Sequence, residues 1–232
     1  MRHRDLQPEL MDQPGLDERL HRQALDGLRR VNWLSRTGSI FWRPVERLAR
    51  ELGVSSLRVL DVACGGGDVG IGLSRKAKRH GLSLRLVGCD ISPVAVGCAC
   101  EQAARQGVDA EFRELDVFRD PLPDGFDVVT CSLFLHHLSE SDAVELLRRM
   151  AAAARHMVLV DDLRRSRFGY LLAWLGCRVL SRSPIVRVDG PLSVRAAFTK
   201  REVVELARQA GLEHVSLTRH WPQRFLLAWR RQ

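Results

Sequence analysis

A glycine-rich turn after a short apolar strand constrains the fold of this chain more than any other feature. Residues 58–70 read RVLDVACGGGDVG, in which four glycines fall among six residues and a helical pattern follows. A strand that leads through such a turn into a helix N-terminus is how α/β folds present backbone N–H groups to a ligand. The sequence therefore predicts an α/β fold with a ligand site at this turn.

The acidic residue at the end of this strand, Asp61, separates two classes of ligand. Gly65, Gly67 and Gly70 match the G-x-G-x-x-G spacing, which fits a dinucleotide and S-adenosylmethionine equally well. A carboxylate here repels the pyrophosphate of a dinucleotide, whereas it attracts the ammonium and sulfonium groups of S-adenosylmethionine. Asp61 therefore favours S-adenosylmethionine and makes a nicotinamide oxidoreductase the disfavoured alternative.

Segments with strand character alternate with helical segments through the middle of the chain. The strands are predicted at residues 57–64, 82–90, 110–116, 126–132 and 156–161, and the helices at 70–80, 93–106 (capped by Ser92) and 142–154 (capped by Ser141). This alternation is typical of a doubly wound parallel sheet. A capping box at Thr199 and Glu202 predicts a further helix, and residues 213–219 and 224–229 predict a hairpin. We therefore expect a seven-stranded, mostly parallel sheet with one antiparallel strand at its C-terminal edge.

Two further acidic residues end the second and third predicted strands. Because parallel strands present their carboxyl ends at one edge of the sheet, Asp90 and Asp116 are expected near the glycine turn. Asp90 can accept hydrogen bonds from ribose hydroxyls, and Asp116 can accept one from an exocyclic amine while the N–H of Val117 meets a ring nitrogen. A single acid at a strand end more often caps the next helix. Three sites in this order, however, match the amino-acid, ribose and adenine parts of one ligand.

Residues 58–161 resemble the class I S-adenosylmethionine-dependent methyltransferases, within them the small-molecule branch that includes the ubiquinone and menaquinone biosynthesis methyltransferases. The motifs that carry the resemblance are Asp61-x-x-Cys64-Gly65-x-Gly67, Asp90-Ile91-Ser92, Asp116-Val117, and Phe126-Asp127-Val128-Val129 followed by Leu135-His136-His137-Leu138. The resemblance implies a Rossmann-like fold and methyl transfer from S-adenosylmethionine. It implies cofactor contacts by Asp61, Ala63, Gly65, Gly67, Asp90, Ile91, Asp116, Val117 and Ser132. Ala63 stands where the family often has glycine, which the turn tolerates unless this residue needs a positive φ.

Two adjacent histidines follow the fourth strand, on the loop that faces the transferred methyl group in this fold. A phenol or enol acceptor benefits from a nearby base, and His136 is the first choice for this role, with His137 beside it. Asp161 and Asp162 end the fifth strand as alternatives, either as the base or as the partner that orients the imidazole. In a purely structural reading, one histidine caps the next segment or packs against a helix. No metal site is predicted, and the six cysteines are expected to be reduced thiols.

Two segments outside the sheet are predicted to recognise the methyl acceptor. Residues 1–52 form an N-terminal helical cap, and residues 162–198 form an insertion with an amphipathic helix in the methyltransferase domain, 53–232. This helix is either a lid over an apolar acceptor, with arginines toward a membrane face or an anionic group, or a plain packing helix. The aromatic residues predicted to contact the acceptor are Trp33, Trp42, Tyr170 and Trp174.

Charge and composition bear on the competing functions. The net charge of +8 comes mostly from arginines spread along the chain, which favours solvated helix faces over nucleic-acid binding. An RNA or protein methyltransferase is the alternative, although the Asn/Asp-Pro-Pro-aromatic signature of nitrogen methylation is replaced by Cys131-Ser132-Leu133-Phe134. A non-catalytic cofactor-binding protein of the same fold is another. The sequence favours methyl transfer to a hydroxyl, with a ring carbon second, of a lipophilic aromatic, polyketide-like or quinone-like small molecule.

The apolar content of the chain predicts a cytoplasmic location. Residues 1–30 lack the apolar core of a signal peptide, and the longest apolar run, Phe168 to Leu180, is too short to span a bilayer and contains Arg178. At most, a peripheral contact with a membrane is compatible with this pattern.

Overall fold

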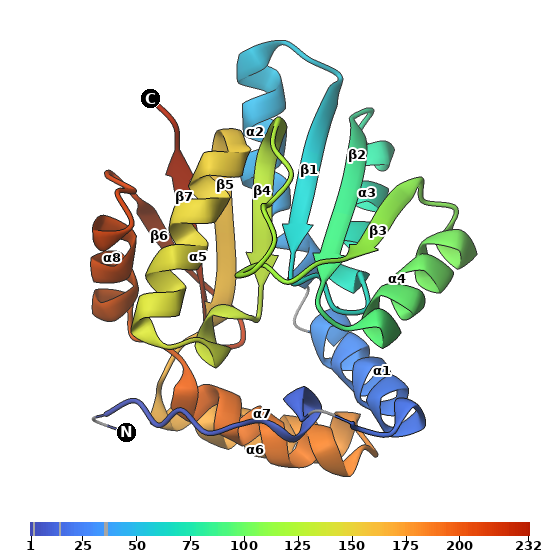
Figure 1. The fold of residues 1–232 in the computed structure, drawn as a ribbon, viewed down its shortest axis with the longest axis vertical. Helices are drawn as coiled ribbons and strands as arrows, with labels where there is room; N and C mark the ends of the chain where they lie inside the picture. Colours follow the sequence, from blue (N-terminus) through green and yellow to red (C-terminus); the bar gives the residue numbers. More distant parts are fainter. Residues whose placement is uncertain (2, 14, 35–36) are drawn as a thin grey trace.

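The computed structural model describes residues 1, 3–13, 15–34 and 37–232. These residues form a seven-stranded sheet of order β3-β2-β1-β4-β5-β7-β6 with helices on both faces, which confirms the predicted fold class (Figure 1). Strands β1 to β5 run parallel, and β7 runs antiparallel to both β5 and β6. The strands are β1 Ser56–Val62, β2 Ser83–Asp90, β3 Ala110–Glu114, β4 Phe126–Ser132, β5 Ala154–Leu163, β6 Ser216–His220 and β7 Arg224–Arg230.

The C-terminal hairpin inserts its antiparallel strand into the sheet instead of adding it at the edge. Because β7 lies between β5 and β6, the edge position expected for this strand is wrong. The first four residues of β7 are buried, whereas every residue of β6 is exposed or half-buried. Apolar side chains gain more from burial between two neighbours, and the more polar β6 therefore takes the edge.

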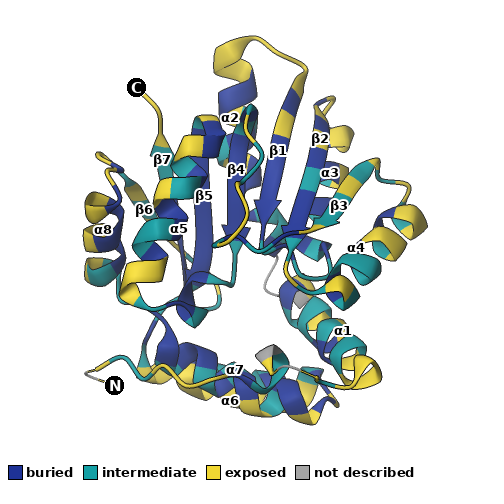
Figure 2. Cartoon of the chain, viewed as in Figure 1, coloured by how far each residue is buried: buried dark blue, intermediate teal, exposed yellow. Residues whose placement is uncertain are grey.

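Helices cover both faces of the sheet, whose inner strands are largely buried, whereas the edge strands β3 and β6 are half-buried or exposed (Figure 2). Helices α5 (Glu140–Ala153) and α8 (Lys200–Gln209) pack on one face through a core that includes Leu146 and Leu206. The opposite core contains Val45 and Ile71 and lies under α2 (Trp42–Leu52) and α3 (Asp68–Arg79), with α4 (Pro93–Gln106) beside them. The sheet thus forms the rigid middle layer that positions the loops at its ends.

Local capping chemistry sets where these helices begin. Ser92 caps α4, and Thr199 and Glu202 form the predicted capping box of α8. Helix α5 begins earlier than predicted, because the side chain of Ser139, not that of Ser141, accepts the hydrogen bond from the backbone N–H of Asp142.

A further layer of helices covers the carboxyl ends of the strands. It combines α1 (Glu18–Leu34) with α6 (Arg167–Leu180) and α7 (Pro184–Ala196) of the insertion, and these three helices contact one another (Figure 1). The insertion holds two helices where the sequence predicted one, because Pro184 starts a new helix after a break. This layer, which we call the cap, joins segments that are far apart in the sequence.

The chain before α1 is fastened across the cap by polar contacts. Both carboxylate oxygens of Asp189 on α7 accept hydrogen bonds from backbone N–H groups, of Leu10 and of Met11, at 3.0 Å each. Arg4 donates to the carbonyl oxygens of His136, at 2.8 Å, and Leu138. The N-terminal segment is thereby held against both α7 and the loop after β4.

Candidate active site

A cavity of about 920 Å³ lies between the carboxyl ends of the strands and the cap. The strand ends supply its polar wall, and the cap supplies leucines such as Leu25 and Leu28 of α1 and Leu172 and Leu180 of α6. Parallel α/β sheets bind ligands at this edge, where helix N-termini and loops converge. The cavity therefore combines acidic groups from the strand ends with aliphatic side chains from the cap.

The glycine-rich turn follows β1 in left-handed backbone conformations. Ala63, Gly65 and Gly67 have φ of 52°, 53° and 75°. Ala63 therefore occupies a conformation that favours glycine and costs an L-residue about 1–2 kcal/mol. Of the residues predicted to contact the cofactor here, Ala63 and Gly65 line the cavity and Gly67 does not; the φ of Gly67 and the 3.0 Å from an added Cβ to Ala99 Cβ both favour glycine at this position.

Asp61 lies on the cavity wall with its carboxylate buried beneath the turn. Its Oδ1 accepts a hydrogen bond of 2.8 Å from Thr130 Oγ1. Burial, together with the nearby charges of Asp68 and Asp90, raises the pKa of Asp61 to about 7. A cationic group in the cavity would favour the ionised form, because it would place an opposite charge beside this buried carboxylate.

Asp68, the first residue of α3, is a half-buried cavity residue that the sequence reasoning missed. Its Oδ2 accepts a hydrogen bond of 2.9 Å from Asn32 Nδ2 on α1, which ties the cap to the turn. Burial raises the pKa of Asp68 as well. The position of Asp68 inside the motif GGGDVG could have indicated that it lies at the ligand site, but nothing in the sequence indicated its contact with Asn32.

Asp90 and Asp116 lie at the same edge of the sheet, as the strand pattern predicted. Asp90 accepts hydrogen bonds from Gly65 N at 2.8 Å and Ser92 N at 3.0 Å, and so its carboxylate is fixed between the turn and the start of α4. Strand β3 ends two residues before Asp116, whose Oδ1 accepts a bond of 2.9 Å from Phe118 N. Both acids line the cavity, together with Ile91, Val117 and Ser132.

His136 forms a buried pair with Asp162. Its Nδ1 lies 2.6 Å from Asp162 Oδ1, and its backbone N–H donates to Asp162 Oδ2 at 3.0 Å. Although burial opposes ionisation, the charge and hydrogen bond of His136 hold the pKa of Asp162 below its ordinary value. The pair assigns the ring hydrogen to Nδ1 and leaves the lone pair on Nε2. Of the two roles predicted for Asp162, the geometry matches the orienting partner.

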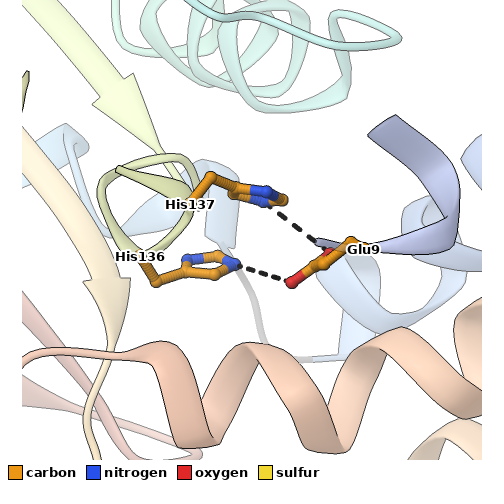
Figure 3. A group of neighbouring side chains, drawn as sticks. All are labelled: Glu9, His136 and His137. Carbon is orange, nitrogen blue, oxygen red and sulfur yellow. Dashed lines mark ion pairs between the residues drawn. The ribbon is translucent and has the colours of Figure 1, made fainter. Parts of the chain in front are cut away.

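His137 and Glu9 complete the polar wall beside His136 (Figure 3). His137 Nε2 lies 3.8 Å from Glu9 Oε2, and His136 Nε2 lies 3.7 Å from Glu9 Oε1. Glu9 was missed because it lies in a polar N-terminal segment without a motif. Only the tertiary fold brings this segment next to the loop after β4.

Asp161, predicted as a catalytic residue, lies outside the cavity lining. Both of its carboxylate oxygens accept hydrogen bonds from the buried guanidinium of Arg224 on β7, and Oδ2 also accepts one of 3.2 Å from Ser132 Oγ. Consecutive residues of a strand point to opposite faces, and so Asp162 meets His136 while Asp161 meets Arg224.

The four aromatic residues predicted to contact the acceptor do not line the cavity. Trp33 is 80% exposed, and Trp42 is 5% exposed within the core under α2. Tyr170 and Trp174 lie on the outer side of α6, 37% and 41% exposed. Helical periodicity places the opposite side of α6 on the cavity, namely Gly169, Leu172, Ala173, Gly176, Cys177 and Leu180.

Comparisons with known proteins agree with this geometry. A family model described as a methyltransferase domain matches residues 59–156. The ubiquinone biosynthesis O-methyltransferase of Ralstonia nicotianae is 31% identical over 169 residues, which are 69% of this chain and 68% of that protein. The enzyme of the same name from Aeromonas salmonicida is 26% identical, and the match covers 69% of this chain and 64% of the relative. Magnesium protoporphyrin IX methyltransferase from Synechocystis PCC 6803, solved with S-adenosylhomocysteine, shares the fold with a TM-score of 0.59 at 17% identity, over 96% and 91% of the two chains.

The sheet order, the glycine turn and the acids at successive strand ends define a nucleoside-binding α/β enzyme fold. The chain belongs to the class I S-adenosylmethionine-dependent methyltransferases, and the relatives that it resembles in sequence are ubiquinone biosynthesis O-methyltransferases. Among the described residues, no helix combines the length and apolarity needed to cross a bilayer.

Replacing Asp90 with alanine is expected to weaken S-adenosylmethionine binding by about 1.5–3 kcal/mol, the usual contribution of hydrogen bonds to a charged group. The change removes the carboxylate predicted to accept from the ribose hydroxyls, and it removes the acceptor of the Gly65 N–H. Titration calorimetry measures the effect, with Asp109→Ala, outside the cavity lining, as the control. An unchanged affinity would refute the ribose assignment.

The affinity for S-adenosylmethionine is expected to rise about tenfold between about pH 5.5 and pH 7. In the free protein the pKa of Asp61 is about 7, and so the carboxyl group is largely protonated at the lower pH and must lose its proton to pair with the cationic ligand. Calorimetry across this range tests the dependence. Asp61→Asn should flatten it, and a flat profile in the unsubstituted protein would contradict the pairing.

Proposed function

We propose that this protein transfers the methyl group of S-adenosylmethionine to a hydroxyl of a lipophilic aromatic or quinone-like small molecule. The observation that carries the proposal is the lining of a single cavity. The glycine turn and the acids Asp61, Asp90 and Asp116 line this cavity together with His136, which is paired with Asp162, and with the aliphatic side chains of the cap.

The chemistry requires little more than this arrangement. The acceptor oxygen attacks the methyl carbon in line with the sulfur, the carbon–sulfur bond breaks, and S-adenosylhomocysteine leaves as a neutral thioether. The protein contributes alignment and the exclusion of water. His136 Nε2 takes the hydroxyl proton, and Asp162 stabilises the resulting imidazolium.

The nature of the cap supports a small apolar acceptor. Its cavity face is mostly leucines, valines and small residues, with the polar His21 and Asn32 on α1, and this surface matches an isoprenoid-like tail or an aromatic ring better than a polynucleotide. The names of the relatives from Ralstonia nicotianae and Aeromonas salmonicida point to the same class of acceptor. An RNA or protein substrate has only the net charge of +8 in its favour.

A direct assay tests the proposal. Purified protein is incubated with methyl-labelled S-adenosylmethionine and four acceptors: a catechol with a prenyl tail, the same catechol without the tail, total RNA and a protein extract. We expect a methyl ether of the tailed catechol, with KM at least about tenfold below that of the tail-free compound because several methylene groups are buried. Label in RNA or protein alone would overturn the proposal, as would cofactor binding without transfer to any acceptor.

A further inference from the structure

We propose that Glu9, His136 and His137 form a binding site for a divalent transition-metal ion on the wall of the cavity (Figure 3). One ligand atom from each residue lies within 4.8 Å of the others, and the two histidine–glutamate distances are 3.7 Å and 3.8 Å. A tetrahedral ion with bonds of 2.0–2.1 Å needs ligand atoms about 3.3 Å apart. Closing the site around an ion would therefore shorten the separations between ligand atoms by at most about 1.5 Å.

The ligands are already oriented by neighbouring groups. Asp162 holds the hydrogen of His136 on Nδ1, and so the lone pair of Nε2 points toward Glu9. Ser193 on α7 donates to Glu9 Oε1 at 2.5 Å, which fixes the carboxylate. A carboxylate behind a coordinating histidine and a hydrogen bond on a coordinating carboxylate are recurring supports of metal sites, because they fix the ligand orientation and raise its basicity.

The local charge also favours a cation. Glu9 and Asp162 are two buried carboxylates on either side of His136. Burying anions without positive charge is costly, and a divalent ion would balance both. Arg4 also contributes positive charge to Asp162, but its side chain donates to backbone carbonyls of the loop and to Ala196 O. The competing explanation is a proton shared between Glu9 and the histidines, which needs no metal.

The donor set indicates the class of ion. Two imidazoles and one carboxylate suit Zn²⁺, Co²⁺, Ni²⁺ or Fe²⁺, whereas Mg²⁺ and Ca²⁺ prefer oxygen ligands alone. With three protein ligands, the ion would keep at least one coordination position open toward the cavity. This proposal rests on the proposed function only for its consequence, because one lone pair cannot serve both roles: His136 Nε2 is the base in the metal-free protein, whereas with an ion bound it would be a ligand, the acceptor hydroxyl would bind at the open position and its proton would leave to water.

The test is metal binding itself, measured on tag-free protein stripped by a chelator and kept reduced. Co²⁺ is titrated and followed by visible absorption, and Zn²⁺ by calorimetry. We expect one equivalent of each ion to bind, Glu9→Gln to weaken Zn²⁺ binding by at least about 100-fold, and Asp162→Asn to weaken it by about 10–100-fold. Glu213→Gln, at an exposed glutamate outside the cavity, should bind like the unsubstituted protein.

Thiols are the main competing ligands, because Cys98 and Cys100 are partly or fully exposed. Metal binding is therefore also measured on a variant in which both cysteines are replaced by serine. The Co²⁺ spectrum of the unsubstituted protein should contain no thiolate-to-cobalt absorption. The proposal is overturned if no equivalent binds, if Glu9→Gln binds like the unsubstituted protein, or if binding disappears with the two cysteines. S-adenosylmethionine calorimetry on the same samples separates the proposals: intact cofactor binding without metal binding removes only the metal site, and metal binding without methyl transfer to any acceptor removes only the proposed function.

Discussion

Replacing His136 with alanine is expected to lower kcat by about 10²–10⁴-fold, the usual contribution of a positioned base. The affinity for S-adenosylmethionine should change little, because the residues proposed to bind the cofactor belong to other loops. The structure places His136 Nε2 on the cavity wall and ties Nδ1 to Asp162 at 2.6 Å. Alanine removes the proton acceptor, and it also removes the imidazole that pairs with the buried carboxylate of Asp162.

Steady-state kinetics with the tailed catechol measure this effect, and calorimetry measures cofactor binding. His156→Ala is the matched control, because this histidine lies on β5 with a half-exposed side chain outside the cavity lining. Asp162→Asn should reduce kcat less than His136→Ala, since an asparagine can still orient the ring. The assays are run on metal-free and Zn²⁺-supplemented protein, because alanine would also remove a proposed metal ligand. Equal turnover of the His136 and His156 variants would show that alignment alone drives the reaction.

The proposed cofactor site could be predicted because its determinants are local in sequence. The turn at 63–67 follows a strand that the residue pattern identifies, and Asp61, Asp90 and Asp116 each stand at or just after a strand end. In a parallel sheet, strand ends converge without further information. The helix starts at Pro93 and Lys200 were likewise set by caps within four residues.

The proposed acceptor site could not be predicted in the same way, because its residues meet only through tertiary contacts. Helix α6 carries apolar residues on both sides, with Leu172 on the cavity and Leu171 and Leu175 exposed. Its pattern therefore did not show which side faces inward, and aromatic character was a poor guide. Glu9 reaches His136 across 127 positions of sequence, and no motif marks such a contact.

The buried ion pair between Asp161 and Arg224 shows the same limit and leads to the largest expected loss of stability. Replacing Arg224 with methionine is expected to lower the free energy of unfolding by about 3–5 kcal/mol. The buried guanidinium donates to Asp161, to Thr37 Oγ1 at 2.6 Å and to Ser132 Oγ on the cavity wall at 3.2 Å. Methionine fills a similar volume but leaves the carboxylate of Asp161 buried without its cation. At about 2–4 °C per kcal/mol for a chain of this size, Tm should fall by roughly 10 °C.

Thermal and urea unfolding of three variants separates charge from packing. Arg230→Met, on the same strand, removes an exposed ion pair with Glu51 and should change stability by less than about 1 kcal/mol. Asp161→Asn combined with Arg224→Met should recover part of the loss, because no unpaired charge remains.

Burial already raises the pKa of Asp161 to about 6 despite Arg224, and without Arg224 the pKa rises further. An acid whose pKa is higher in the folded than in the unfolded state loses stability as pH rises between the two values. The destabilisation by Arg224→Met should therefore be smaller at about pH 5 than at about pH 8, whereas a loss independent of pH would mean that packing, not the unpaired carboxylate, dominates.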